Sequence, residues 1–367
     1  MEHPLWCEIR GKLKEAGDLS FARLMELALY SSHGYYESRA HIGRAGGDFY
    51  TASQSPLFAL TLAAAVDRQI LAWGSPSVVQ VVEVGAGQGE LAQGMATHFL
   101  TSGQKTAIHY CIAEASSHLR QRQRERLSPL SEMKGVEFSW DRPARDLPTV
   151  IIANEVLDAL PVERIRRVHG SWERLAARLR ADGLEWFWTE APANVQRLAD
   201  RYVDCPEGML AEISEACAAL MESTLAGFSG PVLALWFDYG MTREEWQTGI
   251  RPGGTLRAYR NHEIVDPLQQ EYLLEADITA DANWTQAMEL ARQQGMTSIE
   301  LVSQGKFLMD EGIIELVISQ QQGEPDVLKA SQWAQQFRQL ALPEGMGDRF
   351  SVLVCRKGEG AGGTVFR

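Results

Sequence analysis

Residues 78–92 read VVQVVEVGAGQGELA, and this stretch decides the fold class. Its first seven residues are apolar almost throughout, which is typical of a strand buried on both faces of a sheet. Gly85, Gly87 and Gly89 follow, and a helix-forming segment begins directly after them. Glycines here allow a tight turn and the close approach of a ligand to the backbone. The N–H groups at the start of the helix then face that ligand.

Further apolar runs predict the rest of the sheet. They lie at residues 108–115, 136–140, 149–154, 231–237 and 350–357. Helical segments between the first runs predict βαβ crossovers, and hence a doubly wound, Rossmann-like parallel α/β sheet. We expect the last strand to form an antiparallel pair at the sheet edge.

The predicted elements divide the chain into three parts. Residues 1–75 form an N-terminal helical segment, because apolar residues recur at helical spacing within 21–36 and a second helical run covers 57–73. Residues 76–160 and 231–367 form the Rossmann-like core. Residues 161–230 form an insertion between the fourth and fifth strands, with a β-hairpin followed by helix, and we interpret it as a subdomain for a substrate or partner.

Composition excludes several classes of protein. The 367 residues are 45% hydrophobic and 23% charged, which is typical of a globular protein. The net charge of −13 argues against a nucleic-acid partner. The longest apolar run, residues 57–66, has about half of the roughly 20 residues that a membrane-spanning helix needs, so we expect no membrane-spanning segment. The oligomeric state is left open.

Cysteine usage and the first residues of the sequence bear on the cellular compartment. The five cysteines are odd in number and contain no CxxC pair, which indicates a reducing compartment and no metal site. The first residues lack the pattern of a signal peptide. We therefore expect a cytoplasmic protein. The cysteines are Cys7, Cys111, Cys205, Cys217 and Cys355.

Acidic residues around the glycine loop favour an adenosyl cofactor over a dinucleotide. Glu90 occupies the sixth position of a would-be GxGxxG fingerprint, where it would repel a pyrophosphate. Glu83, near the end of the first strand, suits a cationic ligand such as S-adenosylmethionine. Glu114, after the second strand, is placed to accept both ribose hydroxyls. The alternatives are ordinary strand-end charges and, less favoured, an NAD-dependent oxidoreductase.

A family resemblance emerges at residues 148–165, PTVIIANEVLDALPVERI. The run ANE-x-x-DALPV resembles the MidA family of class I methyltransferases, which is related to the mitochondrial complex I assembly methyltransferase. Segments similar to that family cover residues about 19–318 and include HGYY, GGDFYTA, VEVGAGQGEL, DYG, GTLRAYRNH and DITADANW. The resemblance implies an S-adenosylmethionine-dependent enzyme that methylates a protein substrate, with an arginine of a respiratory complex I subunit as the expected acceptor.

Two segments depart from the family pattern. After GDF-x-T the family commonly has Ser-Pro-Glu, whereas this chain has Ala52, Ser53 and Gln54. The family's glycine loop often reads GPGRG, and here it reads GAGQG. The first change removes a carboxylate that would shape the cofactor or substrate pocket, so the substrate is less well implied than the cofactor.

The candidate catalytic residues follow the fourth strand, at the ligand-binding edge of the sheet. A cationic guanidinium acceptor needs carboxylates to hold it. We assign Glu155 as the guanidinium clamp, Asp158 as its partner on the same face of a helical turn, and Asn154 as an orienting residue. The alternative is that Asp158 caps a turn and Glu155 is a solvated strand end. Asp48 and Thr51 form either a lid over the cofactor or a structural turn.

Residues 119–126, LRQRQRER, are interpreted as the solvated face of a helix rather than an RNA contact. A second hypothesis for function is a non-catalytic assembly factor, which binds S-adenosylmethionine but mainly holds a client protein.

Overall fold

A computed structural model describes residues 2–38, 51–181 and 183–358, and the chain divides into two compact units. The sheet unit comprises Thr51–Val156, Leu225–Tyr239 and Ala291–Arg367. The hairpin unit comprises Met1–Tyr50, Leu157–Thr224 and Gly240–Leu290. Each unit is thus assembled from three separate stretches of the chain.

The sheet unit is built on seven strands in the order β16-β17-β10-β5-β2-β3-β4. The strands β10, β5, β2, β3 and β4 are parallel, and β17 runs antiparallel to both β10 and β16. This arrangement confirms the predicted Rossmann-like α/β class. The bounds are β2 (Val78–Val84), β3 (Ala107–Ala113), β4 (Val136–Ser139), β5 (Thr149–Asn154), β10 (Val232–Asp238), β16 (Ser298–Ser303) and β17 (Ser351–Lys357).

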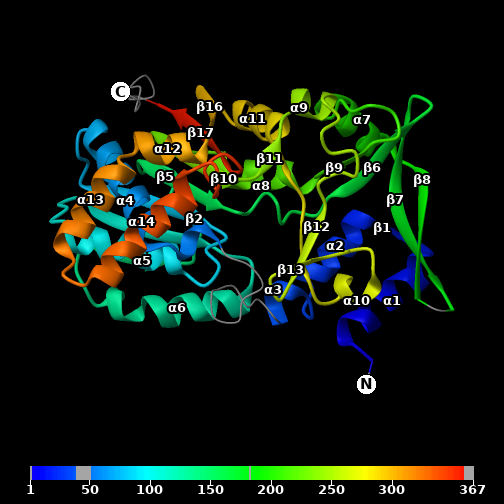
Figure 1. The fold of residues 1–367 in the computed structure, drawn as a ribbon, viewed down its shortest axis with the longest axis horizontal. Coiled ribbons are helices and arrows are strands. Elements are labelled where there is room, and N and C mark those ends of the chain that lie inside the picture. The colour runs from blue at the N-terminus through cyan, green and yellow to red at the C-terminus, as the bar shows by residue number, and fades with distance from the viewer. Residues whose placement is uncertain (1, 39–50, 182, 359–367) are drawn as a thin grey trace. The chain divides into compact units, whose positions relative to one another are not determined.

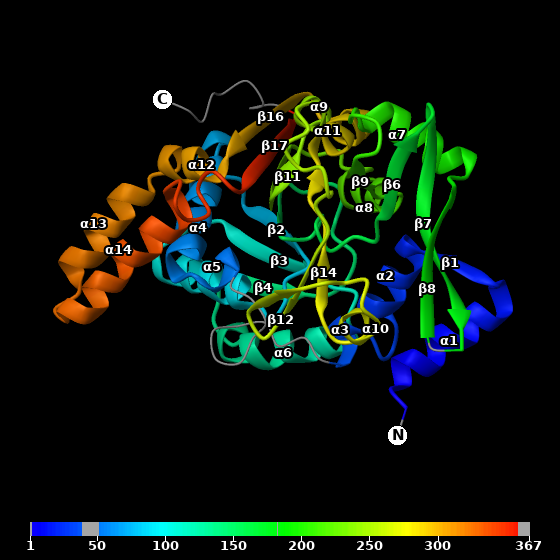
Figure 2. The same ribbon diagram turned by 45° about the vertical axis from the view of Figure 1, so that its right-hand side comes forward.

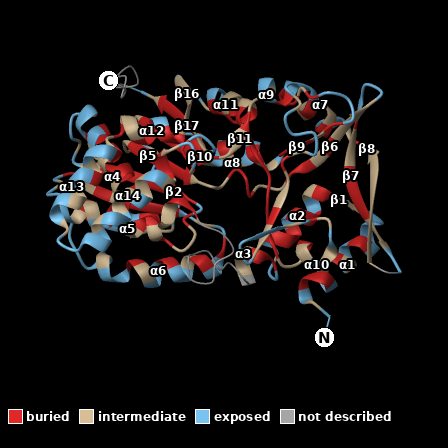
Figure 3. Cartoon of the chain, viewed as in Figure 1, coloured by how far each residue is buried: buried red, intermediate tan, exposed pale blue. Residues whose placement is uncertain are grey.

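The last two strands confirm one expectation. They form an antiparallel pair at one edge of the sheet, and within this pair β17 lies between β16 and β10. The edge position belongs to β16, which the sequence pattern did not reveal because all six of its residues are only half-buried. By contrast, the central strands β2, β5 and β10 are mostly buried (Figure 3).

Helices cover the sheet (Figure 1). Local sequence features explain where one of them begins and how closely two of them pack. The helix α4 starts at Pro56, and Ser55 Oγ accepts the N–H of Phe58 as its N-terminal cap. A Cβ on Gly94 of α5 would lie 2.5 Å from Ala59 Cβ, so this glycine permits close packing of α4 on α5. The bounds are η1 (Ala52–Gln54), α4 (Pro56–Ala72), α5 (Glu90–Thr101), α6 (Ser117–Ser131), α12 (Gln304–Asp310), α13 (Ile313–Gly323) and α14 (Val327–Ala341).

The hairpin unit contains an antiparallel sheet in the order β1-β7-β6-β9, and β8 pairs along β7 (Figure 2). A second sheet has the order β13-β12-β14, and β11 pairs with β15. The bounds are β1 (Asp18–Ser20), β6 (Glu163–Val168), β7 (Ser171–Arg180), β8 (Gly183–Glu190), β9 (Leu210–Ile213), β11 (Gly240–Met241), β12 (Arg257–Arg260), β13 (Glu263–Val265), β14 (Asp277–Thr279) and β15 (Ala282–Asn283).

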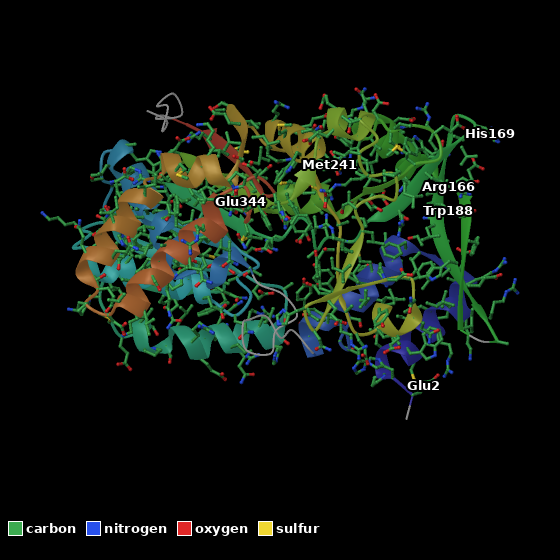
Figure 4. All side chains as sticks on the ribbon, in the orientation of Figure 1. Glu2, Arg166, His169, Trp188, Met241 and Glu344 are labelled. Atoms are coloured by element: carbon green, nitrogen blue, oxygen red, sulfur yellow. The ribbon has the colours of Figure 1, made fainter. Side chains whose placement is uncertain are left out.

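The hairpin unit has a buried core of its own. Trp172 is buried there and donates an indole N–H to Asp200 at 2.7 Å. Arg166 of β6 lies over the ring of Trp188 of β8, 4.4 Å from its centroid (Figure 4). The bounds are α1 (Pro4–Ala16), α2 (Phe21–Tyr30), α3 (Tyr35–Ser38), α7 (Ala193–Tyr202), α9 (Arg243–Gln247) and α10 (Gln270–Leu273), while α8 (Ala216–Leu225) and α11 (Trp284–Gln293) run across the unit boundary.

The units differ from the predicted domains in two places. The helix α4, expected in the N-terminal segment 1–75, belongs to the sheet unit. Residues 240–290, expected in the Rossmann-like core, belong to the hairpin unit. Helical periodicity identifies a buried face but does not say which element covers it, and this explains the first difference. Within residues 2–38, 51–181 and 183–358, no helix has both the length and the apolar composition that a membrane crossing needs.

Candidate functional site

The glycine loop after β2 adopts a backbone that requires its glycines. Gly85, Gly87 and Gly89 have φ angles of +64°, +52° and +83°, a region that other residues rarely adopt. A Cβ on Gly85 would also lie 3.0 Å from a methyl group of Val156. The loop leads directly into α5 at Glu90. Its bare backbone and the first N–H groups of that helix form a cradle that fits an adenosyl ligand.

Glu83 lies within β2, just before this loop. Its side chain is buried, and Oε2 accepts a hydrogen bond of 2.7 Å from the hydroxyl of Tyr110 on β3. Burial raises the pKa of Glu83 to about 8, although the Tyr110 hydrogen bond acts in the opposite direction. At neutral pH the carboxyl group is therefore mostly protonated. Its proposed role in cofactor binding stays a prediction.

Glu114 follows the end of β3. Its Oε1 accepts the backbone N–H of Ser116 at 3.0 Å, and its Oε2 accepts the amide of Gln123 at 3.1 Å. Burial raises the pKa of Glu114, and both hydrogen bonds act in the opposite direction. Each carboxylate oxygen has a second lone pair, so the fixed carboxylate fits a pair of ribose hydroxyls.

Gln123 is a residue of this site that sequence reasoning missed. It lies on α6, is fully buried, and contacts the glycine loop through a 2.8 Å hydrogen bond from Nε2 to the carbonyl of Gly87. Residues 119–126 were expected to be solvated. A signal was present, because Gln123 falls between Leu119 and Leu127 at i, i+4 and i+8, and these three are the buried residues of α6.

Arg126, also on α6, forms an ion pair with Glu90, and this pair weakens the expectation that Glu90 repels a pyrophosphate. Its guanidinium lies 2.9 Å from the Glu90 carboxylate, so this acid is paired. A paired carboxylate repels an anion much less than a lone one does. Glu90 therefore does not by itself exclude a pyrophosphate from the glycine loop.

The predicted lid residues have different outcomes. Asp48 lies outside the described residues. Thr51 is buried, and its hydroxyl lies 2.5 Å from that of Ser53, so it is part of a local turn before η1. The next residue, Ala52, donates its backbone N–H to Glu155 Oε1 at 3.3 Å. Thr51 thus lies next to a contact of the candidate catalytic acid, and its role in cofactor binding stays a prediction.

Asn154 and Glu155 lie together at the carboxyl end of β5. The Asn154 amide donates a 2.9 Å hydrogen bond to Glu155 Oε1, and the Glu155 N–H donates to the carbonyl of Phe237 on β10 at 2.8 Å. Within the described part of the chain, the buried Oδ1 of Asn154 accepts no hydrogen bond. The end of β5 therefore places a buried acceptor that lacks a hydrogen bond beside a carboxylate, and a bound N–H donor could satisfy it.

The expected helical turn after β5 is wrong. Glu155 has a φ of +54°, which is incompatible with continuation into an α-helix, and no helix follows it. The boundary between the units falls after Val156, so Asp158 belongs to the hairpin unit. There Asp158 is buried and its carbonyl accepts the N–H of Ala280 at 2.9 Å. A shared helix face with Glu155 is no longer a reason to assign Asp158, whose catalytic role stays a prediction.

The family-like segments GTLRAYRNH and DITADANW build a buried ion network inside the hairpin unit. Asp281 pairs with Arg257 and, at 3.0 Å, with Arg251. Glu212 accepts hydrogen bonds from the N–H of Thr255 at 2.7 Å and from its hydroxyl at 2.9 Å. Burial raises the pKa of both acids, and the neighbouring arginines counteract it. Within the hairpin unit, these ion pairs and hydrogen bonds join Arg251, Thr255 and Arg257 to Glu212 and Asp281.

A sequence profile of one family matches residues 61–302, more than half of the chain. The family is described as "Putative S-adenosyl-L-methionine-dependent methyltransferase". The chain belongs to this family. The predicted cofactor is thereby confirmed: the protein is a class I methyltransferase that uses S-adenosyl-L-methionine.

Relatives and a solved structure make the resemblance more specific. The chain is 26% identical over 387 residues to "Protein arginine methyltransferase NDUFAF7 homolog, mitochondrial" of Drosophila melanogaster, covering 96% of this chain and 84% of the relative. It is 27% identical over 385 residues to the Homo sapiens protein named "Protein arginine methyltransferase NDUFAF7, mitochondrial", covering 95% and 82%. A superfamily member and "likely methyl transferase" from Burkholderia thailandensis, solved with bound S-adenosyl-homocysteine, matches with a TM-score of 0.82 and 29% identity, covering 98% of this chain and 92% of that one.

The comparisons overturn one expectation. We expected a cytoplasmic protein from the unpaired cysteines, but the curated relatives are named as mitochondrial proteins. The five cysteines are free thiols. Free thiols indicate a reducing environment but do not distinguish one reducing compartment from another, which is why the inference failed.

Proposed function

We propose that this methyltransferase transfers the methyl group to an arginine side chain of a protein substrate. The observation that carries the proposal is the fixed carboxylate of Glu155 at the carboxyl end of β5, beside the unsatisfied Oδ1 of Asn154. The names of the relatives, which describe protein arginine methyltransferases, support the same acceptor. A guanidinium has five N–H donors and matches such a pair of acceptors.

The chemistry sets what these residues must do. S-adenosylmethionine supplies a methyl group on a sulfonium; its carbon–sulfur bond breaks as a carbon–nitrogen bond forms to the acceptor. The acceptor nitrogen must present its electron pair in line and must lose one proton. Glu155 holds the guanidinium, concentrates electron density on the attacking nitrogen and receives its proton. The neighbouring Asn154 Oδ1 accepts a second guanidinium N–H and so fixes the orientation.

Glu155 is well prepared for this role. Its Oε1 accepts hydrogen bonds from the Asn154 amide at 2.9 Å and from the Ala52 N–H at 3.3 Å. The backbone of Glu155 is held in a left-handed conformation by its hydrogen bond to Phe237. Such conformations cost about 1–3 kcal/mol and persist where surrounding structure imposes them, often at functional sites. The strand end thus aims the carboxylate instead of leaving it to solvent.

On the same proposal, the cofactor is held by the residues around the glycine loop. The cofactor contacts the backbone of Gly85, Gly87 and Gly89. Glu114 accepts hydrogen bonds from its ribose hydroxyls, and the Glu83 carboxylate neutralises its positive charge. Asp48 and Thr51 as a lid, and Asp158 as partner of Glu155, remain parts of this proposal that await the same tests.

The experiment uses tritiated S-adenosylmethionine and a lysate of cells that lack the gene. The purified protein should transfer label to protein, and hydrolysis should recover it as methylarginine. Glu155→Gln should bind S-adenosyl-homocysteine with the wild-type Kd but lose at least about 99% of transfer, because the variant keeps the shape and loses the charge. Glu137→Gln, on the exposed side of β4, is the control. Label recovered in another amino acid, or full transfer by Glu155→Gln, would refute the proposal.

We further propose that the acceptor protein is a subunit of respiratory complex I. The family resemblance implies this substrate, and the name NDUFAF7 that the relatives share supports it. The alternative, a factor that binds the cofactor but mainly holds a client, makes the opposite genetic prediction. A gene-deletion phenotype that Glu155→Gln rescues would favour holding. A phenotype that only the wild-type gene rescues, with loss of one methylarginine in a complex I subunit, would support catalysis.

A further inference from the structure

Gln123 joins three segments that end at the same edge of the sheet. Its Nε2 donates to the Gly87 carbonyl at 2.8 Å and to Glu114 Oε2 at 3.1 Å, while its Oε1 accepts the indole N–H of Trp140 at 2.9 Å. The Gly87 carbonyl can only accept and the Trp140 indole can only donate, so the partners fix which end of the amide is which.

The three partners come from consecutive strands of the cofactor half of the sheet. Gly87 follows β2, Glu114 follows β3 and Trp140 follows β4, and these strands are neighbours in the order β2-β3-β4. The helix α6 packs directly on the loop, because a Cβ on Gly89 would lie 3.5 Å from Gln123 Cγ. One buried side chain therefore sets the spacing between the glycine loop, the strand-end acid and the indole.

We propose that Gln123 is a positioning residue for S-adenosylmethionine, which acts through Gly87, Glu114 and Trp140 rather than by touching the reacting atoms. The inference rests on the cofactor, not on the identity of the methylated substrate. Glutamine is specifically suited to the position because it supplies two N–H donors and one acceptor. Leucine or methionine would fill the space but would remove the Gln123 hydrogen bonds to the Gly87 carbonyl, Glu114 Oε2 and the Trp140 indole. Glutamate would place a second carboxylate against Glu114 and the Gly87 carbonyl.

The direct test is calorimetric titration of the purified full-length protein with S-adenosyl-homocysteine. Gln123→Met keeps the length of the side chain and removes its hydrogen bonds, and we expect its Kd to rise roughly tenfold or more. Gln121→Met is the matched control, because Gln121 lies on the same helix, is exposed and donates to the neighbouring Glu125 at 2.9 Å. The control should bind with the wild-type Kd.

Kinetics separate positioning from a general structural defect. With labelled S-adenosylmethionine and the lysate assay, Gln123→Met should raise KM for S-adenosylmethionine by about the same factor as the Kd, with kcat reduced much less. The KM for the protein acceptor should not change. A roughly tenfold or greater loss of kcat at saturating S-adenosylmethionine, with an unchanged KM for S-adenosylmethionine, would overturn the proposal.

A second variant keeps the test decisive if Gln123→Met folds poorly. Trp140→Phe removes only one donor to Gln123 and should weaken S-adenosyl-homocysteine binding severalfold, while the double variant should bind no more weakly than Gln123→Met alone. Wild-type affinity in both single variants, with unfolding midpoints unchanged, would overturn the proposal. Absence of binding by the wild-type protein would instead overturn the cofactor site itself, and absence of methylarginine with normal binding would affect only the proposed acceptor.

Discussion

Replacing Glu83 with glutamine isolates the cost of burying a carboxyl group in the centre of the parallel sheet. In the folded protein its pKa is raised to about 8 from the ordinary value of 4.5. Below pH 4.5 both the folded and the unfolded chain hold the proton. Between pH 4.5 and 8 the unfolded chain releases it while the folded chain keeps it, so stability contributed by the protonated group is lost as pH rises. Above pH 8 the loss levels off.

The magnitude follows from the two pKa values. Between pH 6 and pH 9 the single group should lower the free energy of unfolding by roughly 2–3 kcal/mol. The Glu83 side chain is only 3% exposed, so solvent screening reduces this little. Glutamine has nearly the same shape, can accept the Tyr110 hydroxyl hydrogen bond and does not titrate, so Glu83→Gln should lack this part of the pH dependence.

The assay is urea denaturation of the cofactor-free protein at pH 6, 7, 8 and 9, for wild type and Glu83→Gln side by side. The variant should become more stable relative to wild type as pH rises, and where two transitions are resolved the difference should appear in the one for the sheet unit. Tyr110→Phe removes the donor that favours the carboxylate, so it should steepen the wild-type trend. Parallel pH profiles for wild type and Glu83→Gln would refute the reasoning.

Three further predictions concern other parts of the molecule. Binding of S-adenosylmethionine at pH 7 should release up to about one proton in wild type and none in Glu83→Gln, measured by calorimetry in two buffers of different ionisation enthalpy; equal release in both would remove Glu83 from the site. Gly254→Ala should destabilise the protein by at least about 1–3 kcal/mol, because its φ is +78° and a Cβ would lie 2.4 Å from Glu212 Oε1; unchanged thermal unfolding would contradict this packing. Arg126→Met should cost less than about 1 kcal/mol, since its pair with Glu90 is partly exposed; a larger loss in urea denaturation would show that the pair does more than neutralise Glu90.

The sequence was informative wherever burial alone specifies structure. The runs at β2, β5 and β10 are apolar because both faces of these strands are covered, and each was predicted to within about a residue. The glycine loop was equally readable, because Gly85, Gly87 and Gly89 all need a left-handed backbone. Edge strand β16 was missed because polar residues interrupt its sequence, SIELVS, so that it contains no continuous apolar run.

Other features depend on contacts between distant residues and had no local signature. The left-handed conformation of Glu155 is imposed by a hydrogen bond to Phe237, 82 residues later in the chain (237 − 155). Local pattern alone therefore predicted a helical turn there. Gln123 was set aside because its arginine-rich neighbours dominated the segment, although its place in the buried stripe of α6 was visible.

The interior position of β17 has a consequence for synthesis of the protein on the ribosome. After Asp238, the last residue of β10, the ribosome adds 119 residues to reach Lys357, the last residue of β17 (357 − 238), and β17 pairs with β10 along its whole length. At 5–20 residues per second the ribosome needs roughly 6–24 s to make this stretch. For that time one edge of β10, an apolar strand, has no β17 to pair with and is a template for association with other nascent chains. Slow codons or stalling between these two strands should therefore reduce the yield of folded enzyme more than the same delay earlier in the message.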